Sequence, residues 1–323
     1  DHANEVQTDY VAFDLGFYTE QCRHNDGQRL AGDWAQTTKL TPTPATSEAY
    51  FGNAVDIDGP TLAVGADGAN TNGENAGAVH IIDADEGWTQ TDRLVASDGA
   101  ASDYFGEAVA VASDLVVVGA PGDDGTGDAA GAAYVFERSN GGWTETKLTA
   151  GGADASFGQS VAVAGGTVAV GADGVAQNGQ AEAGAVYLFE ATETGWAQTE
   201  LLTPENPTAQ GYFGARTALT ENGTRLIASA YGDDRAGENA GAVFVFDRDE
   251  SGNWTQTAAL TASDAAANDY FGSNIGVDDD TIVCGAFGDD DSGTDAGAAY
   301  VFTPTDSGWA ETAKLTAADG SDQ

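Results

Sequence analysis

Two sequence markers recur together along this chain, and their common spacing limits the folds that it can form. Tryptophans stand at 34, 88, 143, 196, 254 and 309, which places them 53 to 58 residues apart. Phe-Gly pairs begin at 51, 105, 157, 213 and 271, which are 52 to 58 residues apart. A repeat of this length indicates an architecture in which each repeat forms one unit and neighbouring units bury each other's apolar faces.

Each full repeat contains four strand-like runs separated by turn residues. In the second repeat these are YFGEAVAVA (104–112), DLVVVGAPG (114–122), AGAAYVFER (130–138) and GWTETKLTA (142–150). β-branched and aromatic residues dominate the runs, whereas Gly, Asp, Asn and Ser fill the joints. No segment has the apolar spacing of a helix. Four short strands per repeat predict an all-β fold, a β-propeller in which each repeat forms one four-stranded antiparallel blade.

The polarity of the runs predicts their positions in a blade. The first three are apolar on both faces, as expected for strands covered by neighbouring blades. In the fourth run Trp and Leu share one face and alternate with Thr, Gln and Glu, which is typical of an outer edge strand. We therefore interpret residues such as Phe105 and Trp143 as core anchors and not as part of a ligand site.

The charge of the chain points to its environment. Asp and Glu number 52 against 11 Lys and Arg, which gives a net charge of −41. At about 1 M salt the Debye length falls to about 3 Å, so a folded domain with this charge is largely relieved of self-repulsion. A halophilic source is the favoured interpretation, and an acidic extracellular protein that binds divalent cations is the alternative. Nucleic-acid binding is not expected, because it needs a basic surface.

The repeated motifs resemble a known family. YFG, then VGAPG, then GAAYVF is similar to the FG-GAP repeat, the unit of the N-terminal propeller of integrin α subunits, and five copies in register cover roughly residues 34 to 318. The resemblance implies a propeller with an extracellular, adhesion-type role. Two features depart from integrins. The joint between the first two strands is too short for the integrin calcium loop, and fewer than seven repeats are present.

We predict one propeller domain over residues 1–323. Its repeats span approximately 10–40, 41–95, 96–149, 150–202, 203–261 and 262–318. The first is degenerate, with a recognisable fourth strand from Trp34 to Leu40, so a ring of six blades is favoured. Five blades with a strand exchange at the closure, or part of a larger ring, are the alternatives.

The most distinctive acidic motif follows the second strand of three repeats. Each copy begins with Gly-Asp-Asp, and a further acidic residue follows a few positions later. Carboxylates on such a turn suit calcium, although calcium needs six to eight oxygen ligands. The alternative is that they are solvated turn residues. The candidate calcium ligands are Asp123, Asp124 and Asp128, then Asp233, Asp234 and Glu238, then Asp289, Asp290 and Asp295.

Other motifs carry less information. No metalloprotease, nucleophile-elbow or phosphate-loop motif is present, and we expect neither catalysis nor an organic cofactor. Cys22 and Cys284 either form a disulfide or leave Cys284 a buried thiol. Asn222 and Asn253 begin glycosylation sequons. No apolar run is long enough for a membrane span, and the Asp at position 1 suggests a processed or trimmed N-terminus.

Three functions remain open on the sequence alone. The first is a non-enzymatic extracellular recognition or adhesion module that binds a protein or glycan partner through propeller loops. The second is a structural subunit of a cell-surface layer, appendage or virion, which predicts a large interface with other chains. The third is an extracellular enzyme acting on polysaccharide, which predicts a central pocket with carboxyls of perturbed pKa.

Overall fold

The computed structural model describes residues 38–45, 47, 49–139, 141–278 and 280–317. These residues form twenty strands in five four-stranded antiparallel sheets, and no helix occurs among them. Blade 1 contains β1 (Val55–Asp58), β2 (Thr61–Ala66), β3 (Ala78–Asp83) and β4 (Thr89–Leu94); blade 2 contains β5 (Ala108–Ala112), β6 (Leu115–Ala120), β7 (Ala132–Ser139) and β8 (Gly142–Leu148).

The other three blades repeat this order. Blade 3 contains β9 (Phe157–Ala164), β10 (Thr167–Ala172), β11 (Ala185–Thr192) and β12 (Gly195–Leu202). Blade 4 contains β13 (Thr217–Leu219), β14 (Arg225–Ala230), β15 (Ala242–Arg248) and β16 (Trp254–Leu260). Blade 5 contains β17 (Asn274–Asp278), β18 (Thr281–Ala286), β19 (Ala298–Thr305) and β20 (Gly308–Leu315). The predicted four strands per repeat are confirmed.

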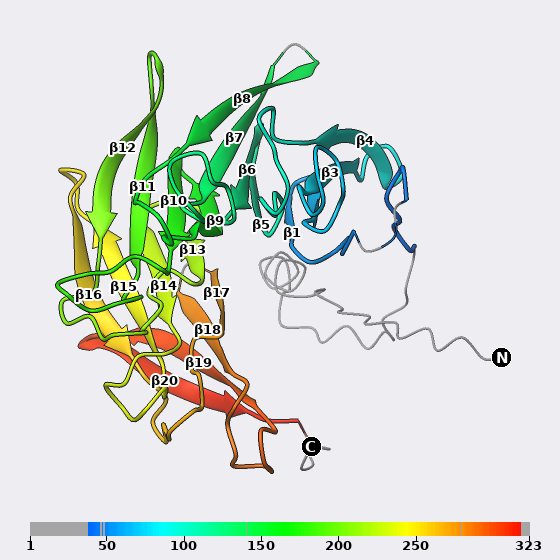
Figure 1. Ribbon diagram of the computed structural model, residues 1–323. Coiled ribbons are helices and arrows are strands. Elements are labelled where there is room, and N and C mark those ends of the chain that lie inside the picture. Colours follow the sequence, from blue (N-terminus) through cyan, green and yellow to red (C-terminus); the bar gives the residue numbers. More distant parts are fainter. Residues whose placement is uncertain (1–37, 46, 48, 140, 279, 318–323) are drawn as a thin grey trace.

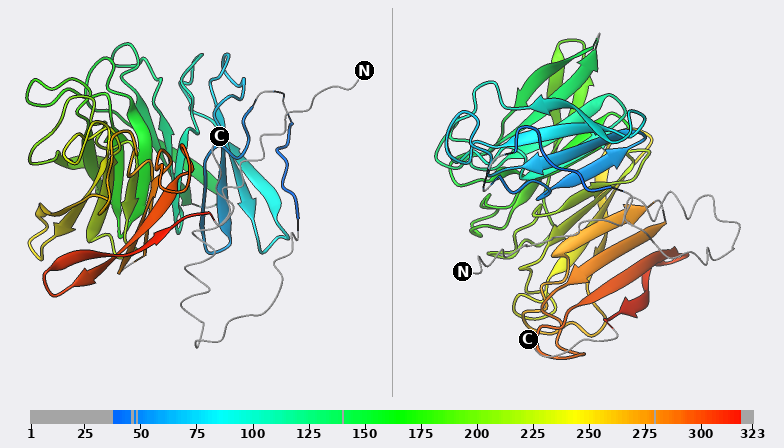
Figure 2. Two further views of the ribbon diagram at one scale, coloured as in Figure 1. Left: turned by 90° about the horizontal axis from the view of Figure 1, so that it is seen from below. Right: turned by 90° about the vertical axis from the view of Figure 1, so that its right-hand side faces the viewer.

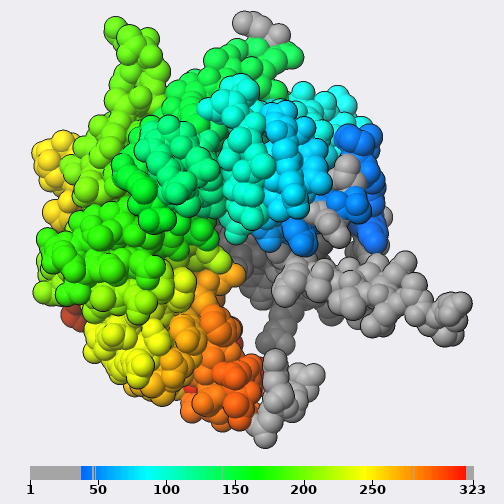
Figure 3. All heavy atoms as spheres, in the orientation of Figure 1, coloured from blue at the N-terminus to red at the C-terminus, as the bar shows by residue number. Residues whose placement is uncertain are grey.

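The blades fan around a common centre (Figure 1), and Figure 2 shows the same sheets from below and from one side. The first strand of each blade lies nearest the centre and the fourth lies at the periphery. Successive inner strands contact each other, β1 with β5, β5 with β9, β9 with β13 and β13 with β17. The five blades thus form successive sectors of an arc (Figure 3), with blades 1 and 5 at its ends.

The Phe-Gly pair couples each blade to the one before it. Phe157, at the start of blade 3, forms a parallel bridge with Gly131, at the start of β7 in blade 2. Gly131 has a φ of +79°, and a Cβ at this position would lie 2.1 Å from the carbonyl oxygen of Phe157. Only glycine fits this backbone-to-backbone approach. The same bridge joins Gly77 to Phe105, Gly184 to Phe213 and Gly241 to Phe271.

The Phe side chains form the core between blades. Phe105, Phe157, Phe213 and Phe271 are all fully buried. Each ring packs edge-on against an aromatic residue of the third strand of its own blade, as Phe105 does against Tyr134 with centroids 5.4 Å apart. The predicted role of Phe105 as a core anchor therefore agrees with its position.

The tryptophans are less buried than the sequence suggested. Trp254 is buried, but Trp88, Trp143, Trp196 and Trp309 are only partly covered. Trp143 lies at the outer end of the β7–β8 hairpin, where it pairs with Arg138, and the guanidinium lies 4.7 Å from the ring centroid. The repeating tryptophan is thus only partly covered in four of the five described blades, and blade 4, with Trp254, is the exception.

The two faces of blade 5 differ in burial. β10, in the middle of the arc, is buried along its whole length, whereas β18 alternates between buried and partly exposed residues. No other described blade covers the second face of blade 5. Residues 10–37 of the degenerate repeat that would complete a six-bladed ring, including Trp34, lie outside the described residues, and residues 38–40 are not in a strand. The six-blade ring therefore stays a prediction.

Candidate functional site

The first aspartate of each Gly-Asp-Asp turn is buried. Asp123, Asp233 and Asp289 are 3%, 1% and 3% exposed. One oxygen of each accepts the backbone N–H two residues later, at distances of 2.9, 2.9 and 3.2 Å from Gly125, Arg235 and Asp291. These aspartates therefore hold the turn together from inside.

The second aspartate of each turn is exposed and closes the loop. Oδ1 of Asp124, Asp234 and Asp290 accepts the backbone N–H five residues later, from Ala129, Asn239 and Asp295, at 2.8, 2.8 and 2.7 Å. Asp295 is thus one position further along its loop than Asp128 and Glu238, both of which are exposed. The three trailing acidic residues do not share a register as ligands, because Thr294 occupies the matching position in blade 5.

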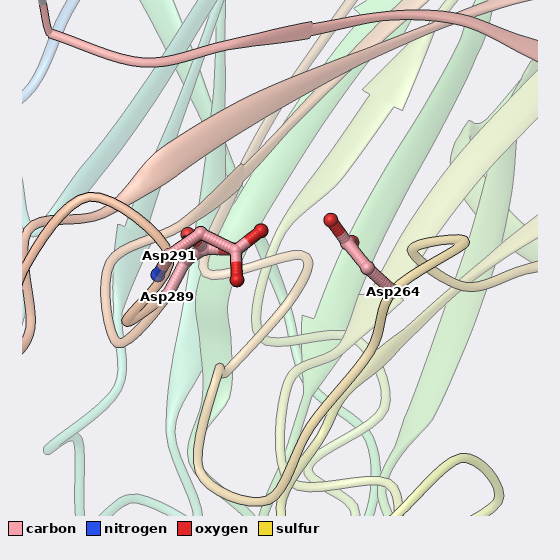
Figure 4. Close-up of side chains that lie close together, drawn as sticks. All are labelled: Asp264, Asp289 and Asp291. Carbon is pink, nitrogen blue, oxygen red and sulfur yellow. The ribbon is translucent and has the colours of Figure 1, made fainter.

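A lysine ammonium fills the acidic cluster of blade 5. Asp264, Asp289 and Asp291 (Figure 4) each offer an oxygen within 4.8 Å of the others. Nζ of Lys314, on β20, lies 2.8, 2.7 and 2.6 Å from their Oδ2 atoms. The hydroxyl of Tyr300 donates to Asp289 at 2.7 Å and to Asp264 at 2.8 Å. The protein therefore supplies its own cation where a metal ion would otherwise be expected.

Blade 2 repeats this arrangement with one carboxylate fewer. Nζ of Lys147 lies 2.7 Å from both Asp98 and Asp123, and the hydroxyl of Tyr134 donates to the same two side chains. Gly125 stands at the position that Asp291 has in blade 5. We call these two clusters the lysine cages of blades 2 and 5.

Blade 4 neutralises its buried aspartate in another way. Ala259 occupies the lysine position of the fourth strand, and the turn residue Arg235 replaces the missing charge. Nε of Arg235 lies 2.7 Å from Oδ1 of Asp233, and its guanidinium lies 4.4 Å from the ring centroid of Phe244. Phe244 has no hydroxyl, and Thr208 donates to Asp233 instead, at 3.2 Å.

The cages shift the pKa values of their members. Burial alone would raise the pKa of Asp289, but hydrogen bonds from Lys314 and Tyr300 outweigh it, so this pKa lies below its usual range. The pKa of Asp264 is lowered in the same way. Burial, together with the bond to Asp289, raises the pKa of Tyr300. The carboxylates stay ionised and bound to lysine, and a calcium ion at these turns would have to displace it.

Sequence reasoning missed the cages, although the chain contains a signal for them. The aspartate before a blade and the lysine on its fourth strand occur together. Asp98 precedes blade 2 with Lys147, and Asp264 precedes blade 5 with Lys314. In blade 3 the two positions hold Gly152 and Leu201, and in blade 4 they hold Asn206 and Ala259. Comparing repeats position by position would have paired these residues.

A row of four aromatic rings crosses blades 4 and 5. Tyr212 stacks on Tyr231 with centroids 5.2 Å apart, and Tyr270 stacks on Phe287 with centroids 5.0 Å apart. Tyr231 and Tyr270 join the two stacks at 6.4 Å. The side chain of Phe287 is 60% exposed, and the three tyrosines are partly exposed. We call these four residues the aromatic row.

The topology places the aromatic row on one face of the propeller. Tyr212 and Tyr270 precede the first strands of their blades, and Tyr231 and Phe287 follow the second strands. In an antiparallel pair these positions lie at the same end of the sheet. Tyr50 and Tyr104 have the same register before blades 1 and 2 and are 64% and 37% exposed. We call this end of the blades the aromatic face.

Two interacting carboxyls lie between blades 1 and 2. Asp67 follows β2, Glu107 precedes β5, and their side chains form a carboxyl pair. Burial raises the pKa of both groups, and the charge of Asp67 raises that of Glu107 further. Asp173, which aligns with Asp67 in the repeat, also has its pKa raised by burial, to about 6. Neither Asp67 nor Asp173 aligns with Asp123, since both stand two positions earlier in the turn.

The remaining predicted residues have separate locations. Cys284 is a fully buried free thiol on β18, and burial raises its pKa; Cys22 lies outside the described residues. Asn222 and Asn253 are exposed in hairpin turns of blade 4. Nδ2 of Asn253 donates to Asp249 at 3.1 Å, whereas Oδ1 of Asn222 accepts the N–H of Thr224 at 3.0 Å.

Comparison with known families identifies the repeat. A sequence profile of the FG-GAP repeat matches residues 34–82, 88–136, 143–189, 196–246 and 254–302. The chain belongs to the FG-GAP repeat family. The segments that start at Trp88, Trp143, Trp196 and Trp254 begin in or directly before the fourth strand of one blade and end in the third strand of the next, so the sequence unit is offset from the blade by one strand. No curated protein matches this FG-GAP chain.

One solved structure shows a similar fold at low identity. A putative 6-phosphogluconolactonase from Bacteroides uniformis is 12% identical with a TM-score of 0.53, and the match covers 81% of this chain and 70% of the other. A protein from Lactobacillus plantarum is 14% identical with a TM-score of 0.49, and the match covers 78% of this chain and 65% of the other.

The described part of the FG-GAP chain contains no helix with the length and hydropathy of a membrane span.

Proposed function

We propose that this FG-GAP propeller is a non-enzymatic recognition module that binds a glycan or protein partner through its aromatic face. The observation that carries the proposal is the aromatic row, which exposes Phe287 and parts of three tyrosines on a surface otherwise rich in carboxylates. Grouped exposed aromatic side chains on a soluble protein are typical of a binding surface.

The aromatic row is rigid before any partner binds. Each tyrosine that starts a blade is followed directly by a fully buried phenylalanine, as Tyr212 is by Phe213 and Tyr270 by Phe271. The hydroxyl of Tyr212 also donates to Glu182 at 3.2 Å. Rings held in this way lose little conformational entropy on binding, which favours affinity.

We infer the environment in which the protein works from its net charge and from its family. A net charge of −41 suits a protein that works in high salt, where long-range repulsion is screened. The resemblance to integrin α propellers supports a place outside the cell or at its surface. A structural role in a surface layer, appendage or virion uses the same face as an interface between chains.

One observation favours an enzyme as the second candidate. Asp67 and Glu107 form a carboxyl pair with raised pKa values, and a carboxyl with a raised pKa can act as a general acid. Incubating the protein with polysaccharides and measuring new reducing ends tests this candidate. Activity that is lost in Glu107→Gln would replace the recognition proposal with catalysis.

Binding to arrayed glycans and to extracted cell-surface proteins, in molar KCl, tests the recognition proposal. We expect the wild-type chain to bind at least one of these ligands. Tyr231→Ala and Tyr270→Ala should weaken that binding at least tenfold. Trp196→Ala, which removes a partly covered ring from the outer hairpin of blade 3, serves as the control and should bind normally. Equal binding by all variants would show that the aromatic row is not the binding surface.

A further inference from the structure

Arg216 is exposed and has no carboxylate oxygen at ion-pair distance among the described residues, although its charge acts on the nearby carboxyls of Asp173 and Glu107. Its Nη1 donates to the carbonyl of Ala215 at 2.8 Å, and the ion pairs of the described residues do not include it. Most other basic side chains in this part of the chain are bound to carboxylates, namely Arg138, Lys147, Arg225, Arg235, Arg248 and Lys314. In a chain with 52 acidic residues, a guanidinium that forms no close ion pair keeps hydrogen-bond donors available for a ligand.

The guanidinium lines a hollow that three blades share. This hollow has a volume of about 280 Å³ and is lined by Gln159 and Asp173 of blade 3, Arg216 and Tyr231 of blade 4, and Ser273 and Phe287 of blade 5. Arg216, Ser273 and Phe287 also border the face of blade 5 that no described blade covers.

The side chains that line the 280 Å³ hollow include the types of group that bind a sugar. Tyr231 and Phe287 belong to the aromatic row, and aromatic rings pack against the apolar C–H face of a pyranose. Gln159, Ser273 and Asp173 offer amide, hydroxyl and carboxyl groups that can bond ring hydroxyls. A planar guanidinium matches a carboxylate with two parallel hydrogen bonds, which gives both orientation and strength.

We propose that this hollow binds a uronic acid residue of an acidic glycan, with the sugar carboxylate on Arg216 and the ring against Tyr231 or Phe287. This inference rests on the recognition function proposed above and names its ligand class. The negative charge of the chain does not oppose it in high salt. At about 1 M salt the Debye length is about 3 Å, so only groups in direct contact with the ligand affect its carboxylate strongly.

Calorimetric titration in molar KCl tests the inference. The probes are oligosaccharides containing glucuronate or galacturonate, and the same oligosaccharides with each carboxyl reduced to an alcohol. We expect the reduced forms to bind at least tenfold more weakly to the wild type. Arg216→Gln should lose at least tenfold in affinity for the acidic forms and should bind acidic and reduced forms equally.

Arg138→Gln is the matched control, because Arg138 lies at the outer rim of blade 2 and pairs with Asp92. It should bind like the wild type, and the melting temperature of each variant verifies its fold. Equal binding of acidic and reduced forms by the wild type, or unchanged binding by Arg216→Gln, would overturn the uronate assignment and leave glycan recognition standing. If the protein bound a protein ligand and no oligosaccharide, the uronate assignment would be overturned. The proposal that the partner is a glycan would be overturned with it.

Discussion

Nζ of Lys314 lies 2.7 Å from Oδ2 of Asp289, and this contact joins the outermost strand of blade 5 to a turn that follows its second strand. The carboxylate of Asp289 is 5% exposed, while Lys314 is 19% exposed. Asp264 joins the same ammonium from the segment before the blade. Lys314 thus joins two other parts of the chain, the segment before the blade and the turn after β18, which lie 23 to 50 residues from it in sequence.

Replacing this lysine should destabilise the propeller. Lys314→Met leaves the buried carboxylate of Asp289 without a cation, and we expect the free energy of unfolding to fall by about 2 kcal/mol. Urea unfolding in molar KCl measures the change. Asp291→Asn is the control, because Asp291 is 65% exposed and an exposed ion pair contributes little. A loss in the control as large as that in Lys314→Met would contradict the assignment.

Calcium should affect the melting temperatures of the wild type and of Lys314→Met differently. In the wild type an ammonium occupies the cluster of Asp264, Asp289 and Asp291, so we expect millimolar calcium to leave the melting temperature nearly unchanged. Lys314→Met frees three carboxylates, and calcium should then raise the melting temperature by binding the folded state alone. A strong calcium effect on the wild type would instead support the calcium turns suggested by the sequence.

Contact between blades should depend on glycine at one position. In Gly131→Ala the new Cβ would meet the backbone of Phe157, so we expect a loss of about 3 kcal/mol or more in unfolding free energy. Gly179 has a nearly identical φ of +81°, but no atom lies within 4 Å of the place that a Cβ would take there. Gly179→Ala should therefore lose only about 1 kcal/mol, the cost of the backbone conformation. Equal losses would show that the contact between blades is unimportant.

The two repeating aromatic markers should differ in their effect on stability. Phe105→Ala removes a fully buried ring and should cost about 3–5 kcal/mol. Trp143→Ala removes a partly covered ring at the rim and should cost about half as much. Thermal melting and urea unfolding of the two variants give the comparison, and a larger loss for Trp143→Ala would reverse this assignment of core and rim.

Asp56 should make the protein more stable in mild acid. Burial raises its pKa from 3.8 to about 6, although its Oδ2 accepts the N–H of Val111 at 2.6 Å. Between these two pKa values the folded state holds a proton that the unfolded state releases, so this group destabilises the protein as pH rises toward 6. Asp56→Asn should be more stable than the wild type by about 2 kcal/mol at pH 7.5 and nearly equal to it near pH 4.

Urea unfolding of both proteins at several pH values measures that difference. Because the other carboxyls are common to both proteins, their contributions cancel in the subtraction. A difference in stability that stays constant across the pH range would show that Asp56 titrates normally.

The sequence by itself determined the blade and its repeat. The sequence predicted four strands per repeat from the Phe-Gly pair, the Val-rich second strand and the aromatic residue of the third strand. This was possible because strand propensity and apolar alternation are local properties of the sequence. Phe105 was also placed correctly in the core. Trp143 was not, because a fourth strand that looks amphipathic in sequence can lie over the centre of a hydrophobic cluster or over its edge.

The sites were decided by tertiary structure. Lys314 and Asp264 are 50 residues apart, and only the closing of one blade against the segment before it brings their charges together. Arg216, Asp173 and Phe287 come from three blades and share a hollow only because those blades converge on one centre. A local pattern specifies a strand, but the distance between side chains on different strands depends on how the sheets pack, and no local pattern contains that distance.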